Sequence, residues 1–335
     1  MIRSLNGMSV RASTSPQGVT AYDRRSILPA SSGTGAETKP RIIARMFGGI
    51  GNQLFIYSAA RALALRNSAD LWLDATSGFE RDPYNRNFAL AAFQIRARIC
   101  PMSLFVSPKM FGRMFRTVLR ASNSVLPPSR RSYLVEPRSH GPALLKRLQV
   151  RGRVILEGYW QDEEYFSDWR HVVAEDLKFK ADRVPSECGT AKAIVGCASV
   201  SVHIRRYDDL MSVSGSAAPL ARLPRTYFLE AIEAVKCKVP DARFFIFSDN
   251  EPWARDEFSS LDSGFVVSPD PSSDWRDLWM MSLCQHHVLS NSTFSWWGRW
   301  LRNASGGVVV APARSRWRLS IHVPTLPSEW QAILV

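Results

Sequence analysis

The chain has 335 residues, of which 45% are hydrophobic and 22% are charged, a composition typical of a globular protein with two domains or one large α/β unit. Lysine and arginine outnumber aspartate and glutamate by 43 to 30, and the net charge of +13 favours anionic partners: phosphorylated small molecules, anionic lipid headgroups or nucleic acid. A transmembrane protein is excluded, because no apolar run reaches the roughly 18 residues that a membrane span needs.

The first 40 residues are rich in Ser, Thr, Gly, Ala and Pro and show no sustained periodicity. They predict a disordered or weakly ordered tail over residues 1–40, without the apolar middle region of a secretory signal. The five cysteines are scattered and lack C-x-x-C or metal-ligand spacing, which is typical of reduced thiols. We therefore expect a cytoplasmic protein, and peripheral contact with a membrane stays open.

Residues 41–180 are predicted to form an N-terminal α/β domain. The pattern predicts a strand over 42–46, a glycine-rich turn over 47–51, an alanine-rich helix over 52–66 and a strand over 71–74.

The loop Gly48–Gln53 (GGIGNQ) joins this first strand to its helix. It lacks both the G-x-G-x-x-G spacing of a dinucleotide site and the G-K-[ST] of a P-loop. Gly49 and Gly51 allow close approach of the backbone, and Asn52 and Gln53 offer amides. This chemistry fits a cleft loop that recognises the hydroxyl groups of an acceptor sugar, or a leaving phosphate from the opposite side.

The segment 101–151 has no clear pattern apart from residues 109–120, where apolar residues recur with helical spacing and arginines lie between them. Two interpretations stay open for this helix. Its apolar face packs on the core, or it lies on a membrane surface. Pro127 and Pro128 end any helix here.

The C-terminal part, residues 181–335, alternates strands with helices, which predicts a doubly wound parallel sheet. Ligands of such sheets bind beyond the carboxyl ends of the strands, where the strand order reverses. We predict strands over 198–204, 243–247, 264–267, 287–290 and 308–311, and helices over 225–237, 252–258, 274–285 and 293–302.

Four charged or titratable residues follow one another at the end of the strand 198–204: His203, Arg205, Arg206 and Asp208. Arginine binds phosphate oxygens with a planar, permanently charged fork, so this pair suits a pyrophosphate. A solvated loop with a run of charges is the alternative for this motif taken alone.

Two further polar groups are predicted at the same edge. Ser248 and Asp249 end the strand 243–247 and can accept hydrogen bonds from a ribose or a base, and Asp277 lies at the start of the helix 274–285.

The run from Ser290 to Gly298 passes from a strand directly into a helix. Asn291, Ser292 and Ser295 supply polar side chains there, and the first backbone N–H groups of the helix face the ligand edge. An N-cap at Asn291 or Ser292 with buried tryptophans behind it is compatible with that function.

These motifs together resemble those of the α-1,2-fucosyltransferases of glycosyltransferase family 11. The resemblance implies a GT-B-like α/β fold, in which two Rossmann-like domains face a cleft and the C-terminal domain holds GDP-β-L-fucose. The loop Gly49–Gln53 would then close the site from the other domain. The motifs that carry the resemblance are GGIGNQLFIYSAARALA (48–64), HIRRYD (203–208), FIFSD (245–249) and DLWMMSLCQHHVLSNSTFSWWGRWL (277–301).

The resemblance also implies functions for single residues. Arg205 would hold the β-phosphate and stabilise the departing GDP, while His203 and Asp277 would recognise guanine or orient the nucleotide. Ser292 and Ser295 would add phosphate contacts. The acceptor would be a galactose-containing glycan, either free or lipid-linked.

We expect an inverting transfer without a metal or another cofactor, because fixed positive charge beside the β-phosphate stabilises the leaving group and no Asp-x-Asp motif ends a strand. Asp208 is the candidate for the base that deprotonates the acceptor hydroxyl. It could equally be an ion-pair partner that orients Arg205 or Arg206.

The sequence departs from the family pattern at Tyr207, Asp209 and Arg299, which replace residues that are commonly glycine, aromatic and alanine. A different GDP-sugar donor or linkage on the same fold is one alternative. A basic non-catalytic nucleic-acid binder is another, but the chain shows no recognised module and no face of interleaved basic and aromatic residues, so we expect no nucleic acid partner. The sequence does not indicate an oligomeric state.

Overall fold

The computed structural model describes residues 39–101, 109–185, 187–206, 222–268, 273–312, 326–330 and 333–334. The chain from Lys39 to Val335 forms one compact unit. Apart from Lys39 and Pro40, the predicted tail over residues 1–40 lies outside the described residues and stays a prediction.

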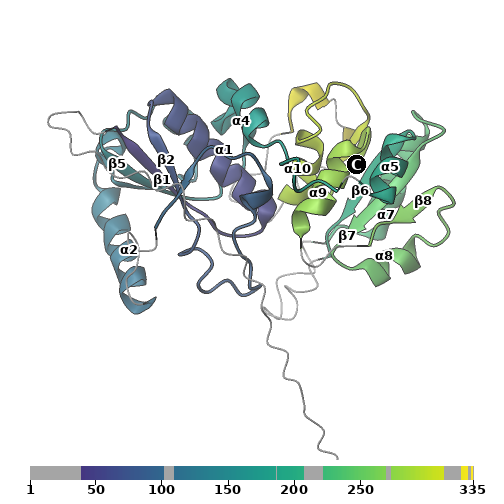
Figure 1. Cartoon of the computed structure of the whole chain (residues 1–335), viewed down its shortest axis with the longest axis horizontal. Coiled ribbons are helices and arrows are strands. Elements are labelled where there is room, and N and C mark those ends of the chain that lie inside the picture. Colours follow the sequence, from purple (N-terminus) through teal and green to yellow (C-terminus); the bar gives the residue numbers. More distant parts are fainter. Residues whose placement is uncertain are drawn as a thin grey trace, which may run out of the picture. The chain divides into compact units, whose positions relative to one another are not determined.

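Among the described residues, the first sheet has five parallel strands in the order β3-β2-β1-β5-β4 (Figure 1). The predicted strand, helix and strand at its start are confirmed within two residues at each end as β1, α1 (Ile50–Arg66) and β2. β5 lies beside β1 in the middle of the sheet although it comes last in the chain. The strands are β1 (Arg41–Arg45), β2 (Asp70–Asp74), β3 (Arg98–Ile99), β4 (Tyr133–Val135) and β5 (Arg153–Glu157).

The two faces of this sheet are covered by different helices. Side chains alternate along a strand, so Ile42 and Ala44 of β1 join the large core cluster on the side of α1, while Ile43 points to the opposite face. There a small cluster that includes Ile43 and Tyr133 packs against Leu119 of α2 (Lys109–Ser124). α2 is therefore the outer cover of the second face.

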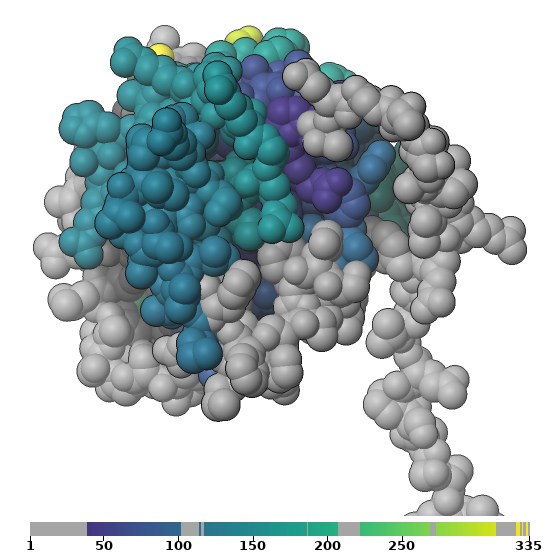
Figure 2. Space-filling model, turned by 90° about the vertical axis from the view of Figure 1, so that its left-hand side faces the viewer, coloured from purple at the N-terminus to yellow at the C-terminus, as the bar shows by residue number. Residues whose placement is uncertain are grey.

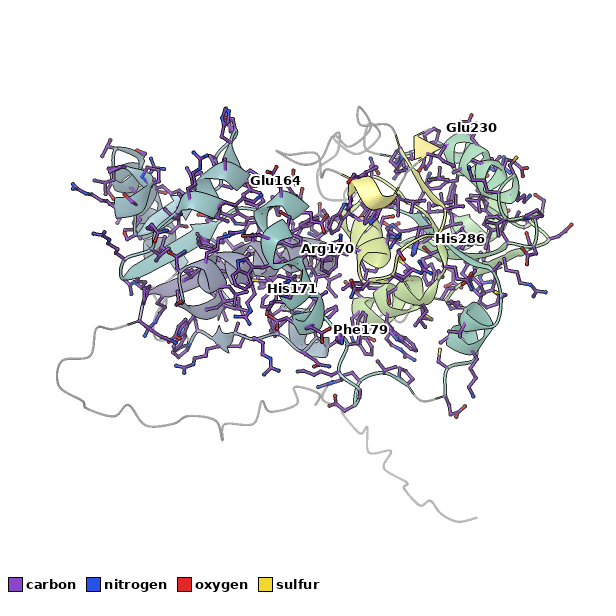
Figure 3. All side chains as sticks on the ribbon, turned by 90° about the horizontal axis from the view of Figure 1, so that it is seen from above. Glu164, Arg170, His171, Phe179, Glu230 and His286 are labelled. Carbon is purple, nitrogen blue, oxygen red and sulfur yellow. The ribbon has the colours of Figure 1, made fainter. Side chains whose placement is uncertain are left out.

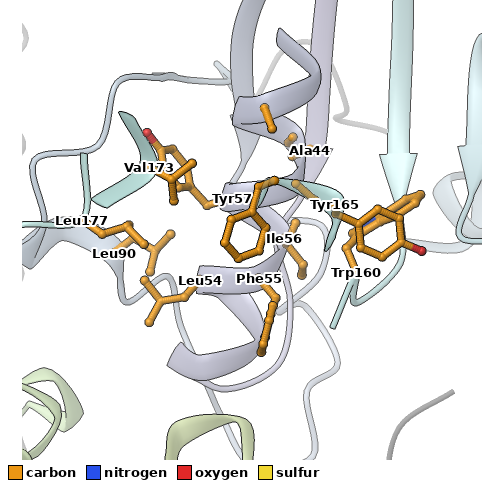
Figure 4. Packing of buried hydrophobic residues seen from close by; sticks show 14 of the residues in the cluster. Ala44, Leu54, Phe55, Ile56, Tyr57, Leu90, Trp160, Tyr165, Val173 and Leu177 are labelled. Carbon is orange, nitrogen blue, oxygen red and sulfur yellow. The ribbon is translucent and has the colours of Figure 1, made fainter. Parts of the chain in front are cut away.

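α1 is apolar on nearly all sides, which is the pattern of a helix buried in a core. Figure 4 shows Leu54, Phe55 and Ile56 packed among residues from the strands and helices around it. Tyr57 carries one of the buried polar groups of α1: its hydroxyl donates to the Asp176 carboxylate at 2.7 Å, which ties α1 to α4 (Arg170–Asp176).

The second sheet is also parallel, with six strands among the described residues in the order β11-β10-β9-β6-β7-β8. Counted from β6, this is the 3-2-1-4-5-6 order of a Rossmann fold, which confirms the predicted α/β fold with a doubly wound C-terminal sheet. The strand order reverses between β6 and β9. The strands are β6 (Ser199–Ile204), β7 (Arg243–Ser248), β8 (Gly264–Val266), β9 (His286–Val288), β10 (Val309–Ala311) and β11 (Ile333–Leu334).

The remaining helices connect these strands. The remaining helices are α3 (Gly141–Arg147), α5 (Gly189–Val195), α7 (Arg225–Lys236), α8 (Glu251–Glu257), α9 (Asp274–Leu283) and α10 (Thr293–Trp300), with 3-10 turns at Leu90–Ala92, Pro128–Arg130, Glu163–Tyr165, Ser167–Trp169 and Ser328–Trp330. Among the described residues, no helix is both long enough and apolar enough to cross a bilayer.

A block of buried aromatic rings packs α10 against α1. The ring centroid of Phe55 lies 4.7 Å from that of Trp296 and 4.9 Å from that of Trp297, and Phe166 stacks on Trp297 at 6.0 Å. Arg170, labelled in Figure 3, lies with its guanidinium 5.4 Å from the Trp300 ring. One hydrophobic cluster thus includes residues of both predicted domains, and their boundary at residue 180 stays a prediction.

A charged cluster around the buried Glu157 lies at the carboxyl ends of β1 and β5 and includes Arg120 of α2 and Tyr133, the first residue of β4. The Glu157 carboxylate accepts from Arg45 Nη1 at 3.1 Å, from Arg120 Nε at 3.0 Å and from the Tyr133 hydroxyl. Burial alone would raise the pKa of this carboxyl, but the hydrogen bonds from Arg120 and Tyr133 and the charge of Arg45 lower it below 4.5.

We expect Glu157→Gln to reduce the free energy of unfolding by about 2 kcal/mol at pH 7, because it removes an ionised acceptor from three donors. A lowered folded-state pKa stabilises the fold above the unfolded pKa, and this contribution is lost as the pH falls through the folded pKa. The difference between variant and wild type should therefore shrink below about pH 4.5.

Urea unfolding at several pH values measures this difference. Glu164→Gln is the matched control, since Glu164 is 62% exposed and pairs only with Lys146 at 3.3 Å among the ion pairs of the described residues. An equal loss of stability in both variants would contradict the special position of Glu157.

Candidate functional site

The carboxyl ends of β6 and β9 form the edge at which a ligand of this sheet should bind, because the strand order reverses between them. His203 near the end of β6 and Ser290 just after β9 meet there, with 2.9 Å between His203 Nδ1 and the Ser290 hydroxyl. The Tyr227 hydroxyl of α7 donates to the Leu289 carbonyl at 2.6 Å and fixes the chain that follows β9.

His203 is a buried, neutral side chain. Its ring stacks on Phe294 of α10 with 5.1 Å between the ring centroids. Burial, and secondly the charge of Arg205, lowers its pKa from 6.5 to about 3. At neutral pH the ring therefore offers hydrogen bonds but no charge, and positive charge at this edge comes from the arginines.

Asp249 at the end of β7 holds both arginines. Its Oδ2 lies 3.3 Å from Arg205 Nε, and its Oδ1 accepts from the Arg206 backbone N–H at 2.7 Å. The Arg206 guanidinium lies 4.0 Å from the ring centroid of Trp253, in cation–π contact. Arg205 and Arg206 thus belong to a built cluster and not to a loose run of charges, while the predicted contact of Asp249 with a ribose stays a prediction.

The other predicted donor-binding residues lie on separate elements of the C-terminal part of the chain. The Ser248 hydroxyl accepts from the Asn250 backbone N–H at 3.1 Å, and Asn250 is the N-cap of α8. Asp277 lies in the first turn of α9, and Asn291 is buried after β9. Asp208 lies outside the described residues.

α10 begins at this edge as the sequence predicts. Ser292 is its N-cap, and its hydroxyl accepts from the Phe294 backbone N–H at 3.3 Å. Ser295 is fully buried, and its hydroxyl accepts from the Ser290 backbone N–H at 2.9 Å, so it supports the turn before the helix. Phosphate contacts of Ser292 and Ser295 stay predictions.

The first turns of α1 and α10 touch. A Cβ atom on Gly51 would lie 2.7 Å from the Phe294 backbone nitrogen and 2.7 Å from Thr293 Oγ1, so this approach requires glycine. Asn52 Oδ1 accepts from Thr293 Oγ1 at 3.0 Å and from Gln161 Nε2 at 2.8 Å. Two positive helix ends therefore meet in one place, which favours an anion there.

Gln53 has a structural function that the sequence does not reveal. Its amide is buried, donates to the carbonyls of Gly48 and Asn87 at 2.9 Å each, and accepts from the Ala89 backbone N–H at 2.8 Å. The side chain thereby holds the loop 84–89 against the glycine loop. Direct recognition of an acceptor by Gln53 stays a prediction.

A cavity of about 450 Å³ lies beside this loop, lined in part by Gly49, Gln53, Tyr84, Arg86 and Trp275. The Arg86 guanidinium lies 4.2 Å from the centroid of the Tyr84 ring. Aromatic rings with amide and guanidinium donors suit a sugar. Tyr84, Arg86 and Trp275 were not predicted as site residues, although the polar and aromatic run of residues 84–87 was an available signal.

Phe179, labelled in Figure 3, lies between Phe93 and Trp275, with ring centroids 4.7 and 6.3 Å away and the rings tilted by 35° and 41°. Trp275 is thereby packed against a pair of tilted aromatic rings. Its position at the cavity is set by packing rather than by a flexible loop.

Arg299 is explained by local structure. It is buried, its Nη2 donates to the carbonyls of Ala304 and Gly306 at 3.2 Å each, and its guanidinium lies 5.4 Å from the Trp330 ring centroid. This departure from the family pattern therefore closes the turn after α10.

In the described part of the chain, no three His, Cys, Asp or Glu side chains converge as metal ligands. All five cysteines lie in that part and are free thiols. Independence from metal stays a prediction for the activity assay below.

Two known proteins match this chain over most of its length, and a third matches about a third of it. It is 29% identical over 279 residues to an alpha-1,2-colitosyltransferase of Escherichia coli, covering 81% of this chain and 91% of that protein. It is 27% identical over 285 residues to the O-antigen biosynthesis glycosyltransferase WbnK of Escherichia coli, covering 80% and 92%. A galactoside alpha-(1,2)-fucosyltransferase 1 of Leontocebus fuscicollis is 28% identical over 120 residues, covering 33% and 30%.

Among solved structures, the fucosyltransferase NodZ from Bradyrhizobium aligns with a TM-score of 0.45 and 15% identity, covering 78% of this chain and 92% of that chain.

The family model described as "Glycosyl transferase family 11" matches residues 149–320, more than half of the chain. The matched region contains three of the four motifs seen in the sequence and the whole β6–β9 edge, while the glycine loop lies before it. The resemblance drawn from the motifs is confirmed: the chain belongs to glycosyltransferase family 11 and is a glycosyltransferase.

Proposed function

We propose that this glycosyltransferase moves L-fucose from GDP-β-L-fucose to the 2-hydroxyl of a galactose residue in a glycan, with inversion and without a metal. One observation carries the proposal: the Arg205–Asp249 cluster lies at the carboxyl end of β6, where His203 stacks on the first turn of α10. The first turn of α1 packs against that same turn of α10. This edge concentrates positive charge from a guanidinium and two helix ends.

The charge fits the leaving group. Cleavage of the sugar–phosphate bond leaves negative charge on the diphosphate, and donors that are already fixed stabilise it without reorganisation. Asp249 holds Arg205 in place, and neutral His203 adds a hydrogen-bonding group without competing for the phosphate. The cavity at Gly49, Arg86 and Trp275 is the proposed place for the sugar side of the reaction.

Asp208 is the proposed base. The Arg205 guanidinium already pairs with Asp249, and the Arg206 guanidinium lies on the Trp253 ring, which supports the base over the ion-pair alternative. Asp208→Asn should then lower kcat without weakening the binding of GDP.

A second candidate donor is a GDP-activated colitose. The observation that favours it is the 29% identity to an alpha-1,2-colitosyltransferase over 91% of that protein. Both candidates share the 1,2 linkage and the same diphosphate site.

The relative WbnK belongs, by its name, to O-antigen biosynthesis, which supports a polysaccharide precursor, free or lipid-linked, as the acceptor. We propose that the reaction takes place in the cytoplasm.

An assay of the purified full chain separates these candidates. We expect turnover of GDP-fucose with a β-galactoside, unchanged by EDTA, and a product whose linkage analysis shows fucose on the 2-hydroxyl. GDP-colitose and GDP-mannose are run in competition under the same conditions.

Faster turnover of GDP-colitose would replace the first donor by the second. Loss of turnover in EDTA that returns with a divalent cation would refute the metal-free mechanism. If none of the three donors led to release of GDP, the proposed function as a whole would be refuted.

A further inference from the structure

Exposed apolar side chains gather on one part of the first sheet. Among the described residues, six of the eight large hydrophobic side chains that are exposed lie within residues 99–135. Met114 and Val118 of α2 are 60% and 59% exposed, and Val125 beyond its end is 83% exposed. The six are Ile99, Met114, Val118, Val125, Leu126 and Val135.

The rotation of α2 about its axis is fixed by contacts on its inner side. Leu119 packs against the small cluster on the sheet, and the buried Asn123 side chain accepts from the backbone N–H groups of Ser132 and Tyr133 at 2.7 and 3.1 Å. Met114 and Val118 are one helical turn apart and share the opposite, outward face. Figure 2 shows this side of the molecule, with residues of α2 at the surface.

The same stretch is strongly basic. Residues 98–135 contain seven lysines and arginines and no aspartate or glutamate, so they carry +7 of the net charge of +13. Arg98 and Arg130 are exposed, while Arg120 is neutralised by Glu157. The seven are Arg98, Lys109, Arg113, Arg116, Arg120, Arg130 and Arg131.

We infer that this surface docks on an anionic membrane. We call it the α2 surface and define it by Met114, Val118, Val125, Leu126 and Arg130. Apolar side chains that enter the headgroup boundary, together with basic side chains that attract anionic lipids, are the two requirements for a helix that lies on a membrane. Residues 98–135 contain no acidic side chain that anionic lipid headgroups would repel.

The α2 surface is joined to the edge of the first sheet where β1 and β5 end, next to the glycine loop that follows β1. Arg120 of α2 binds Glu157 at the carboxyl end of β5, and Glu157 in turn binds Arg45 at the end of β1. A protein docked through α2 therefore keeps this edge at a fixed distance from the lipid. This inference does not depend on which sugar is transferred.

Sedimentation of the full chain with lipid vesicles tests the inference. We expect binding to vesicles of phosphatidylglycerol and phosphatidylcholine, little binding to phosphatidylcholine alone, and weaker binding when salt is raised from about 0.05 to 0.5 M. Met114→Ser with Val118→Ser should weaken binding at least about tenfold, because two apolar groups no longer enter the lipid. Arg130→Glu should weaken it only for anionic vesicles.

The matched control is Val195→Ser with Phe265→Ser, since these two side chains are 65% and 52% exposed but lie on the second sheet's side of the chain. It should bind like the wild type. Val125→Ser, outside the helix, is a second variant that keeps α2 unchanged.

Three outcomes would overturn the inference: no binding of the wild type to anionic vesicles, equal binding to phosphatidylcholine, or unchanged binding of both the Met114/Val118 and the Val125 variants. Light scattering of the same proteins measures their oligomeric state and so tests whether a second copy of the chain, instead of a membrane, binds the α2 surface. A wild-type dimer that becomes a monomer in the Met114/Val118 variant, without vesicle binding in either, would assign the α2 surface to a second copy of the chain.

Discussion

Arg205→Ala lowers kcat by at least about 10²–10³-fold while the protein stays folded, if the guanidinium at the end of β6 stabilises the leaving diphosphate. The side chain is about a quarter exposed and paired with Asp249, so its removal costs the fold little. Initial rates with a saturating GDP-sugar, together with a melting curve by circular dichroism, measure both effects.

Two further variants give this test its control. Arg205→Lys keeps the charge but loses the planar fork, and it should recover only part of the rate. Arg225→Ala removes an arginine of α7 that is 43% exposed and paired with Glu257 of α8 at 2.9 Å, and it should keep the full rate. An Arg205→Ala protein with half or more of the wild-type kcat would end the phosphate assignment.

Gly51→Ala is expected to damage stability and activity together. The new Cβ would lie 2.7 Å from the Phe294 nitrogen and 2.8 Å from the Thr293 carbonyl carbon, and backbone atoms cannot move aside as a flexible side chain can. The first turns of α1 and α10 must separate, at a cost of about 1–3 kcal/mol in the free energy of unfolding. We also expect at least a tenfold fall in turnover, because the two helix ends no longer converge.

Gly189→Ala is the matched control, since a Cβ atom there meets nothing within 4 Å. It should leave the melting temperature and the rate unchanged. If Gly51→Ala behaved in the same way, the close approach of the two helices would not matter for this enzyme.

The repeating part of the fold could be predicted from local pattern. Strands β6, β7 and β9 and helices α7 and α10 lie within two residues of their predicted bounds, because each is an apolar run or a helical repeat bounded by polar or proline residues. The parallel, doubly wound character of the second sheet followed from the alternation of strands and helices, while the strand order itself was not predicted. His203 and Ser290 meet as the switch-point rule requires.

Three of the five strands of the first sheet could not be predicted from the sequence. β3, β4 and β5 have two, three and five residues, and β5 (RVILE) begins and ends with charges that look like loop. What makes β5 a strand is its pairing with β1, more than a hundred residues earlier in the chain. A short segment of sequence does not reveal a strand partner that lies so far away in the chain.

In the site, residue types could be predicted but partners could not. Asp249 was expected to face a ribose, yet its two oxygens lie on Arg205 and on the Arg206 backbone. Gln53 was expected to face an acceptor, yet its amide is used by three backbone groups. Both side chains meet partners from distant segments, which only the folded chain brings together.

The aromatic block around Phe55, Phe166, Trp296 and Trp297 limits how this enzyme can move. Each buried aromatic ring keeps roughly 150–250 Å² of surface area from contact with water, so a hinge rotation that separated α1 from α10 would expose a large apolar interface. The contact between α1 and α10 should therefore stay rigid during the catalytic cycle. Movements that admit substrate or release product should be confined to loops such as residues 84–89.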